Sequence, residues 1–237
     1  RLFMYLSLSH ITIESCKCYK NILVTSVQTY SEFFWTKLKL CGTDNLGKLP
    51  PFFIDCKPGS TSFSFGLADH LEQFNFANPD ALLPEVVAHE YVHAVVHSLN
   101  PLGAIGQAGA INESLADVFA IAFKGLNTDW KIGTYRTLSL DFTTKNVIEI
   151  PEGDESQEND FGQVHNNSLV LSHGFYLTVQ QHPACSNELL QIWWNSFLQL
   201  KIHTHVGFVA KTIEVAGSNF LLLEAIKKSW LTIGFKL

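Results

Sequence analysis

The sequence has few charged residues and no cluster of basic ones. Only 16% of its 237 residues are charged, and 16 Lys and Arg against 22 Asp and Glu give a net charge of −6. A nucleic-acid-binding surface needs a positive patch, and a membrane-spanning helix needs an apolar run of roughly 18 residues. Because the chain has neither feature, we expect neither nucleic acid nor a membrane as a partner. The hydrophobic content of 46% fits one large domain or two small lobes.

Cysteines are few and scattered, at Cys16, Cys18, Cys41, Cys56 and Cys185. No C-x-x-C pair occurs, so neither a cysteine zinc site nor a complete disulfide framework is predicted, and the redox compartment stays open. The apolar stretch at residues 2–8 has two interpretations, the remnant of a signal's apolar core or a strand, and we favour the strand. On that interpretation the chain shows no intact signal peptide.

One stretch, residues 84–99, carries a recognisable chemical pattern, His89-Glu90-Tyr91-Val92-His93, inside an apolar run. It has the signals of a helix, because Pro84 suits the first turn and Asn100-Pro101 ends the pattern. In a helix, two histidines four residues apart lie on one face, where both rings can bind one tetrahedral zinc ion. We therefore predict His89 and His93 as metal ligands.

Glu90 distinguishes this interpretation from an amphipathic helix that carries two histidines and no metal. Burying a carboxylate without a partner is costly, and a water molecule on the metal supplies that partner. Zinc lowers the pKa of such a water to roughly 7, so Glu90 can take its proton as a general base. The pattern predicts the catalytic end of a hydrolase.

A second helix is predicted around residues 110–119, after a glycine-rich connection. Glu113 and Asp117 share a face of this helix because they are four residues apart. Glu113 can complete a site of two histidines and one glutamate with water in the fourth position, the ligand set of catalytic zinc. Asp117 can then accept the second N–H of a ligating histidine, a contact worth about 10- to 100-fold in affinity or activity. The alternative for Asp117 is an ordinary solvated helix charge.

These motifs together resemble the thermolysin family of zinc metallopeptidases, from about residue 26 to the C-terminus. The resemblance rests on H-E-x-x-H, nineteen intervening residues, then Gly109-Ala110-Ile111-Asn112-Glu113 with Asp117, and on the stretches 129–133 and 160–168. It implies an α+β fold of two lobes: a small N-terminal α/β lobe, residues 1–100, that ends in the zinc helix, and an α-helical lobe, residues 101–237. It also implies a monomeric, secreted zinc endopeptidase that cleaves peptides or proteins before bulky apolar residues.

The resemblance assigns further site residues. His165 would donate a hydrogen bond to the oxyanion of the reaction, with Asp160 holding its ring. A carboxylate beside a histidine favours the cationic ring, which is the better donor to developing negative charge. Arg136 and Asn112 would contact the substrate. Without the resemblance, His165 reads as a capping residue of a helix over residues 167–180.

The other elements follow from periodicity. Apolar spacing predicts helices over residues 26–40, 187–200, 207–215 and 219–233, and edge strands over residues 50–56 and 60–65, with short extended pieces over residues 1–25. The acidic stretch 149–160 is predicted to be a mobile surface loop. Trp193, Trp194 and Trp230 are predicted to be core residues.

Some positions depart from the family pattern. Ala104 stands eleven residues after His93, where family members carry a tyrosine that donates to the oxyanion. The family's substrate-binding edge strand has only a weak candidate in Ser62-Phe63-Ser64-Phe65-Gly66, and most of the preceding β-rich segment is missing. The alternative function is therefore a catalytically impaired zinc-binding relative or a fragment. A zinc aminopeptidase fits less well, because the motif for a free amine is not found.

The resemblance also bears on calcium, which the family binds near the zinc helix through a carboxylate cluster. Glu85 and Asp129 align with two of these carboxylates, whereas Lys124, Lys131 and Thr134 stand where three others are expected. Calcium needs roughly 6–8 oxygen ligands and repels ammonium groups. We predict that the lysines pair with Glu85 and Asp129, so that calcium is not required. The alternative is that both lysines are solvated.

Overall fold

The structure is a computed structural model that describes residues 17–47, 52–57, 60–65, 74–76, 83–134, 136–139 and 155–237. The elements in chain order are α1 (Lys17–Leu38), β1 (Phe52–Lys57), β2 (Ser60–Phe65), β3 (Phe74–Phe76), α2 (Pro84–Leu99), α3 (Gly106–Lys124), β4 (Lys131–Ile132), β5 (Arg136–Thr137), the 3₁₀ helix η3 (Gln157–Asn159), α4 (Asp160–Gln181), the 3₁₀ helix η4 (Pro183–Cys185), α5 (Ser186–Leu198), α6 (His205–Ala216) and α7 (Phe220–Ile233). The described chain is mostly helical, as predicted for its C-terminal part. The division into lobes at residue 100 stays a prediction.

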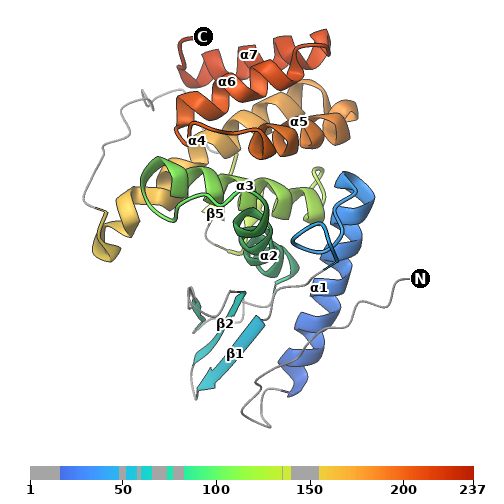
Figure 1. The fold of residues 1–237 in the computed structure, drawn as a ribbon, viewed down its shortest axis with the longest axis vertical. Coiled ribbons are helices and arrows are strands. Elements are labelled where there is room, and N and C mark those ends of the chain that lie inside the picture. Colours follow the sequence, from blue (N-terminus) through green and yellow to red (C-terminus); the bar gives the residue numbers. More distant parts are fainter. Residues whose placement is uncertain are drawn as a thin grey trace.

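Helices α2 and α3 occupy the middle of the fold, with α5 to α7 above them and α1 at the right in Figure 1, where α1 also contacts α5. Helix α2 begins with Pro84 at its first turn and ends at Leu99, as the sequence predicts. The side-chain amide of Asn100 then donates to the carbonyl oxygens of Phe197 (2.8 Å) and Leu200 (3.3 Å). Phe197 lies in the last turn of α5, where carbonyl groups have no partner further along the helix, and Asn100 supplies a donor there.

The helical part packs around buried tryptophans. Trp193 and Trp230 are fully buried and stack with ring centroids 5.8 Å apart, and Trp194 is 5% exposed. Helix α4 approaches α7 closely because Gly174 has no side chain: a Cβ there would lie 2.0 Å from the Trp230 ring. The prediction that the three tryptophans are core residues is confirmed.

Helix α1 packs on α2 and α3 through aromatic side chains. Phe34 lies 5.7 Å, ring to ring, from both Tyr91 and Phe119. The helix begins at Lys17, so the prediction of extended structure up to residue 25 was wrong for its last nine residues. Propagation of a helix gains one hydrogen bond for each residue that is fixed, whereas nucleation fixes several residues for one bond, so a helix that has formed can extend past the segment whose apolar spacing predicts it. The strand predicted at residues 2–8 lies outside the described residues.

Two small sheets accompany the helices. In the first, β2 pairs antiparallel with β1, with Ile54 opposite Phe63, and also with β3, with Phe63 opposite Phe74. β2 was predicted to be an edge strand, and this was wrong because β3 covers its second edge from Thr61 to Phe63. β3 has only three residues, too few for an alternating pattern to predict it.

Helix α4 spans Asp160–Gln181, but Phe161, Gly162 and Gln163 have non-helical backbone angles, so its regular turns begin after Gln163 rather than at residue 167. His165 therefore lies in the first regular turn of the helix. The end of the acidic stretch that was predicted to be a loop is the 3₁₀ helix η3 followed by the start of α4, and residues 149–154 lie outside the described part.

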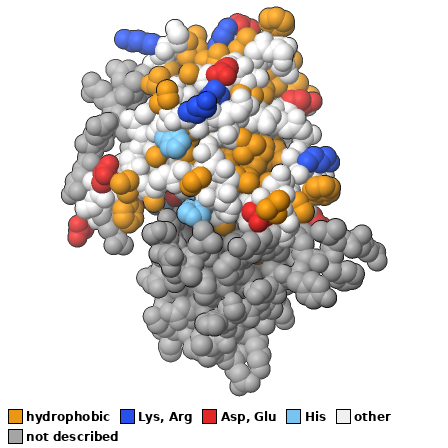
Figure 2. All heavy atoms as spheres, viewed as in Figure 1, with side chains coloured by type: hydrophobic (Ala, Val, Ile, Leu, Met, Phe, Trp, Pro, Cys, Tyr) orange, Lys and Arg blue, Asp and Glu red, His pale blue; other side chains and the backbone are white. Residues whose placement is uncertain are grey.

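On the face drawn in Figure 2, hydrophobic side chains gather in a group near the middle of the described part, with charged side chains around it. Single exposed apolar residues such as Ile202 and Val206 are common on soluble domains. Among the described residues, no helix has the length and apolarity needed to cross a membrane.

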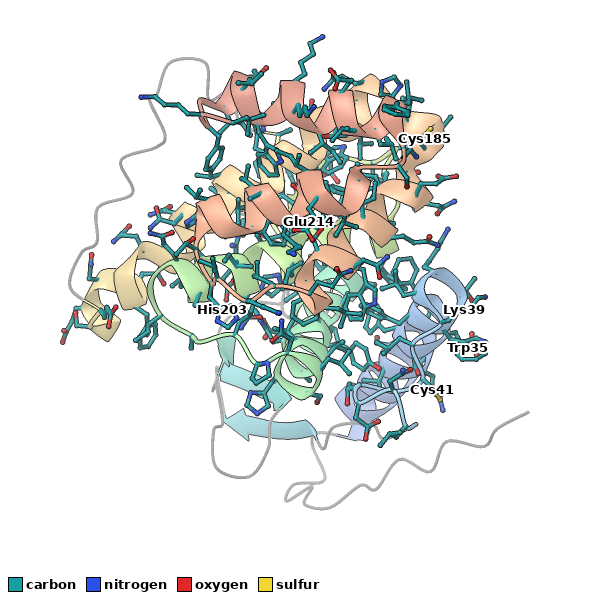
Figure 3. All side chains as sticks on the ribbon, turned by 45° about the horizontal axis from the view of Figure 1, so that its top comes forward. Trp35, Lys39, Cys41, Cys185, His203 and Glu214 are labelled. Atoms are coloured by element: carbon teal, nitrogen blue, oxygen red, sulfur yellow. The ribbon has the colours of Figure 1, made fainter. Side chains whose placement is uncertain are left out.

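Cys41, after α1, and Cys185, in η4, both carry free thiols and lie well apart in the fold (Figure 3).

Candidate metal centre

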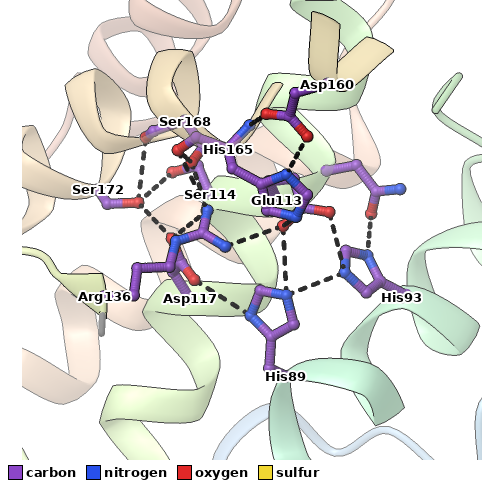
Figure 4. Close-up of polar contacts among 11 residues, drawn as sticks. His89, His93, Glu113, Ser114, Asp117, Arg136, Asp160, His165, Ser168 and Ser172 are labelled. Carbon is purple, nitrogen blue, oxygen red and sulfur yellow. Dashed lines mark hydrogen bonds and ion pairs between the residues drawn. The ribbon is translucent and has the colours of Figure 1, made fainter. Parts of the chain in front are cut away.

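The imidazole rings of His89 and His93 meet the carboxylate of Glu113 where α2 packs on α3 (Figure 4). The two Nε2 atoms are 3.1 Å apart, and the carboxylate lies 3.3 Å from each of them, through Oε2 to His89 and Oε1 to His93. Among the described residues, these three form the one group of His, Cys, Asp and Glu side chains close enough to hold a metal ion. Tetrahedral ligands about 2.0–2.1 Å from zinc lie roughly 3.3–3.4 Å from one another. The donor set and its spacing therefore fit a zinc ion with one position left open.

The far side of each histidine contacts a residue of α3, which orients the ring. His93 Nδ1 lies 3.0 Å from the side-chain oxygen of Asn112, and His89 Nδ1 lies 3.1 Å from Asp117 Oδ1. Asp117 is fully buried, so the alternative of a solvated helix charge was wrong. Contacts of this kind fix the tautomer and the direction of a metal-binding imidazole.

The charges at the site favour a cation. Burial raises the pKa of the Glu113 carboxyl, but the neighbouring His93 and His89 lower it more, so that its pKa lies well below its ordinary value. For His89, burial lowers the pKa, and contacts with Asp117 and Glu113 raise it further than burial lowers it. Glu113 is therefore an anion at neutral pH, ready to bind a positive ion.

Arg136 links the metal-site carboxylates to α4. Its Nη1 donates to Glu113 Oε2 (3.1 Å), and its Nη2 lies 3.0 Å from Asp117 Oδ2 and donates to Ser168 Oγ at 2.6 Å. The side chain is 10% exposed, and the pairing of β4 with β5 brings it here, with Ile132 opposite Arg136. One guanidinium faces two carboxylates, so a negative charge remains to balance a metal ion.

His165 faces the same site from α4. Its Nε2 lies 3.3 Å from Glu113 Oε2, and its Nδ1 lies 2.6 Å from Asp160 Oδ1. The second oxygen of Asp160 accepts the backbone N–H of His165 at 3.1 Å. One carboxylate therefore holds both the ring and the backbone of His165, whose side chain is 48% exposed and accessible to a ligand.

Glu90 and Ala104 complete the set of predicted positions. Glu90 is 6% exposed and follows His89 on α2. Ala104 is exposed in the connection between α2 and α3 and has no hydrogen-bonding side chain to offer. The sequence-based candidates around the metal centre thus lie on two packed helices, the start of α4 and the strand β5.

Three serines of the site were missed. Ser172 Oγ lies 3.0 Å from Ser114 Oγ and 3.4 Å from Asp117 Oδ2, and Ser168 Oγ donates to the carbonyl oxygen of His165 at 2.8 Å. They tie α3 to α4 behind Asp117 and Arg136. His165, Ser168 and Ser172 are three and four residues apart, so they share one face of the helix. This spacing could have predicted from the sequence that Ser168 and Ser172 lie beside the site.

The paired helices, the group of His89, His93 and Glu113 and the facing His165 form a candidate metal centre. The profile of the thermolysin metallopeptidase α-helical domain matches residues 102–235, and the chain belongs to the thermolysin metallopeptidase family.

Two curated relatives show how much of the chain is shared. An extracellular metalloprotease of Pectobacterium carotovorum subsp. carotovorum is 29% identical in an alignment of 182 residues that covers 63% of this chain and 52% of the relative. The neutral protease NprE of Bacillus pumilus is 33% identical over 119 residues, 44% of this chain and 38% of the relative. The chain therefore spans about half the length of the first relative and less of the second.

Among solved structures, the precursor of protealysin, a metalloproteinase from Serratia proteamaculans, has a similar fold. Its TM-score is 0.71 at 19% sequence identity, and the match covers 96% of this chain and 81% of that chain. The similarity extends to nearly the whole chain, beyond the helical part that the family profile matches.

Proposed function

We propose that the protein is a zinc-dependent endopeptidase that hydrolyses peptide bonds before bulky apolar residues. The observation that carries the proposal is the spacing of the three donors, 3.1 Å and twice 3.3 Å, with Glu90 directly after the first ligand. Closed structural zinc sites use four protein ligands, whereas a site with three protein ligands leaves room for a substrate or water. The name of the Pectobacterium relative supports secretion as part of the proposal.

The chain's own residues divide the chemistry as follows. His89, His93 and Glu113 would hold zinc, which when bound polarises the substrate carbonyl and acidifies water. Glu90 takes a proton from the attacking water and passes it to the leaving amine. His165, held by Asp160, donates a hydrogen bond to the oxygen that gains negative charge.

Arg136 and Asn112 are proposed to contact the substrate from the β5 and α3 sides. Both side chains already contact proposed metal ligands: Arg136 contacts Glu113, and Asn112 contacts His93. A substrate group that binds either side chain therefore lies beside the metal ligands, where the reacting carbonyl must be.

A second candidate is a zinc-binding relative without turnover. Ala104 favours it, because this position offers no donor where the resemblance places a tyrosine. The loss of one oxyanion donor costs on the order of 10²–10³ in rate.

Hydrolysis of an internally quenched peptide, with both ends blocked, separates the two candidates. The endopeptidase should cleave it on the N-terminal side of a Leu or Phe, lose activity in a zinc chelator and regain it with added zinc. A protein that binds one zinc per chain but cleaves no blocked peptide is the second candidate, and cleavage that persists in the chelator contradicts both. Because the peptide has no free amine, an aminopeptidase leaves it intact.

We also propose that Lys124 takes the place of a calcium ion. Its ammonium lies 2.7 Å from Asp129 Oδ1 and 3.3 Å from Glu85 Oε1, and it donates to the carbonyl oxygen of Lys131 at 3.0 Å. Burial lowers the pKa of Lys124, but its contacts with Asp129 and Glu85 raise it further, so the ammonium stays charged. The Lys131 side chain itself is exposed, and this residue contributes through its backbone.

Thermal melts in excess calcium and in a calcium-selective chelator are therefore expected to coincide, because the Lys124 ammonium already occupies the place between Glu85 and Asp129 where the ion would bind. The variant Lys124→Glu is the matched comparison. It joins a third carboxylate to Glu85 and Asp129, so its Tm should be lower than that of the wild type without calcium and should rise on calcium addition. A rise of several degrees in the wild type would contradict the proposal.

A further inference from the structure

The chain directly before His165 follows an unusual backbone path. Asp160, Phe161, Gly162 and Gln163 have φ angles of 52°, 51°, 91° and 59°, which form a left-handed turn at the start of α4. A left-handed conformation costs roughly 1–2 kcal/mol for each residue other than glycine. Gly162 also packs on Gly106 of α3, where a Cβ would lie 3.3 Å from the Gly106 backbone. Such a turn persists only if its surroundings hold it.

Two further contacts of the turn, one part-buried and one exposed, are made within its own segment. The Gln163 amide donates to Asn159 Oδ1 at 2.7 Å, and the Asn166 amide donates to Gln163 Oε1 at 2.7 Å. Hydrogen bonds between side chains that water can reach contribute little, because water replaces either partner. These contacts do not tie the turn to the rest of the protein.

Asn167 makes a buried contact to the same turn. Its side-chain Nδ2 donates to the carbonyl oxygen of Gly162 at 3.1 Å, and the residue is 9% exposed. A buried carbonyl that loses its donor is left unsatisfied, which costs about 1–3 kcal/mol. The amide of Asn167 therefore opposes rearrangement of the turn at its central residue.

Asn167 is itself held from α6. Its carbonyl oxygen lies 3.3 Å from Nε2 of His205, whose backbone N–H donates to Gln107 Oε1 at 2.9 Å. Burial lowers the pKa of His205 to about 4, so the ring is neutral at pH 7. With its proton on Nε2 it donates to Asn167, while Nδ1 is buried and has no hydrogen-bond partner. Asn167 thus connects the turn to the starts of α6 and α3.

We propose that Asn167 is a positioning residue for His165: it locks the left-handed turn that sets where the His165 ring stands relative to Glu113. The proposal rests on the proposed function for its catalytic consequence only. Asn167 does not touch the reacting atoms, and it acts through the backbone of residues 160–163. A role in general helix stability is the competing explanation, and the two differ in what happens when His165 is absent.

The experiment compares Asn167→Ala with Asn166→Ala. The second variant also removes an asparagine side chain, but at the preceding, exposed position. We expect Asn167→Ala to lower kcat by about tenfold with KM within twofold, in line with the loss of a group that orients a catalytic residue. In a His165→Ala background the same substitution should have no further effect on kcat, because the residue through which it acts is gone. Asn166→Ala should have no effect on kcat or KM in either background.

A second measurement is independent of activity. Amide hydrogen exchange of His165, whose N–H donates to Asp160 Oδ2, and of Phe161, whose N–H donates to the Ser156 carbonyl, should speed up in Asn167→Ala but not in Asn166→Ala. Amides of α7 serve as the internal reference, since a global loss of stability would accelerate them too. If Asn167→Ala does not fold, Asn167→Leu removes the donor while keeping the number and branching of the side chain's non-hydrogen atoms.

Each outcome decides the proposal. Unchanged exchange at His165 and Phe161, acceleration matched in α7, or a kcat loss that adds fully to that of His165→Ala would overturn it. If the wild type cleaves no peptide, the proposed function fails, and exchange alone then decides whether Asn167 locks the turn.

Discussion

Glu90→Gln is expected to keep zinc bound and to abolish detectable peptide hydrolysis. The glutamine side chain has nearly the same shape as glutamate, so it fits the buried site on α2, where Glu90 is 6% exposed. It is neutral and cannot take a proton from water, and the loss of a general base typically costs about 10²–10⁴-fold in rate. The proposed ligands His89, His93 and Glu113 are unchanged, so the affinity for zinc should persist.

Zinc content after gel filtration and the rate on a quenched peptide are measured on the same samples. Glu85→Gln is the matched control, because Glu85 is also buried on α2 but faces Lys124. It should lose some thermal stability, through its broken ion pair, and keep its kcat. Parallel loss of metal and activity in Glu90→Gln would show that Glu90 supports the metal site rather than the proton transfer.

His165→Ala is expected to lower kcat by about 10²–10³-fold while KM changes by no more than a few-fold. A hydrogen bond to a developing oxyanion forms mainly in the transition state, so its loss appears in kcat. The side chain is 48% exposed, so truncation leaves no buried cavity and the Tm should stay close to that of the wild type.

The control for this variant is His97→Ala, which removes an exposed histidine near the end of α2. It should behave as the wild type in kcat, KM and zinc content. A change in KM alone for His165→Ala would instead assign His165 to substrate binding, and a loss of zinc would assign it to the metal centre.

Local geometry made part of the site predictable. A helix has 3.6 residues per turn, so the four-residue spacing of His89 and His93 dictates one shared face whatever the helix packs against. The same rule groups Glu113 with Asp117 on the next helix. The start and stop of α2 also follow from residues within a turn of its ends, such as Pro84 and Asn100.

Contacts between elements required the tertiary structure. Whether β2 is an edge strand depends on β3, and the register of β4 with β5 puts Arg136 beside Glu113 and Asp117.

The sequence by itself determined the helices of the C-terminal part, the shared face of the two H-E-x-x-H histidines and the assignment to the family. These depend on residues close together in the chain. Only the tertiary structure decided that the Asn167 side chain is buried against a left-handed turn and that the adjacent Asn166 is exposed. The two are the same residue type at neighbouring positions. They differ because helix rotation and the packing of α3 and α6 place one of them inside and the other in water.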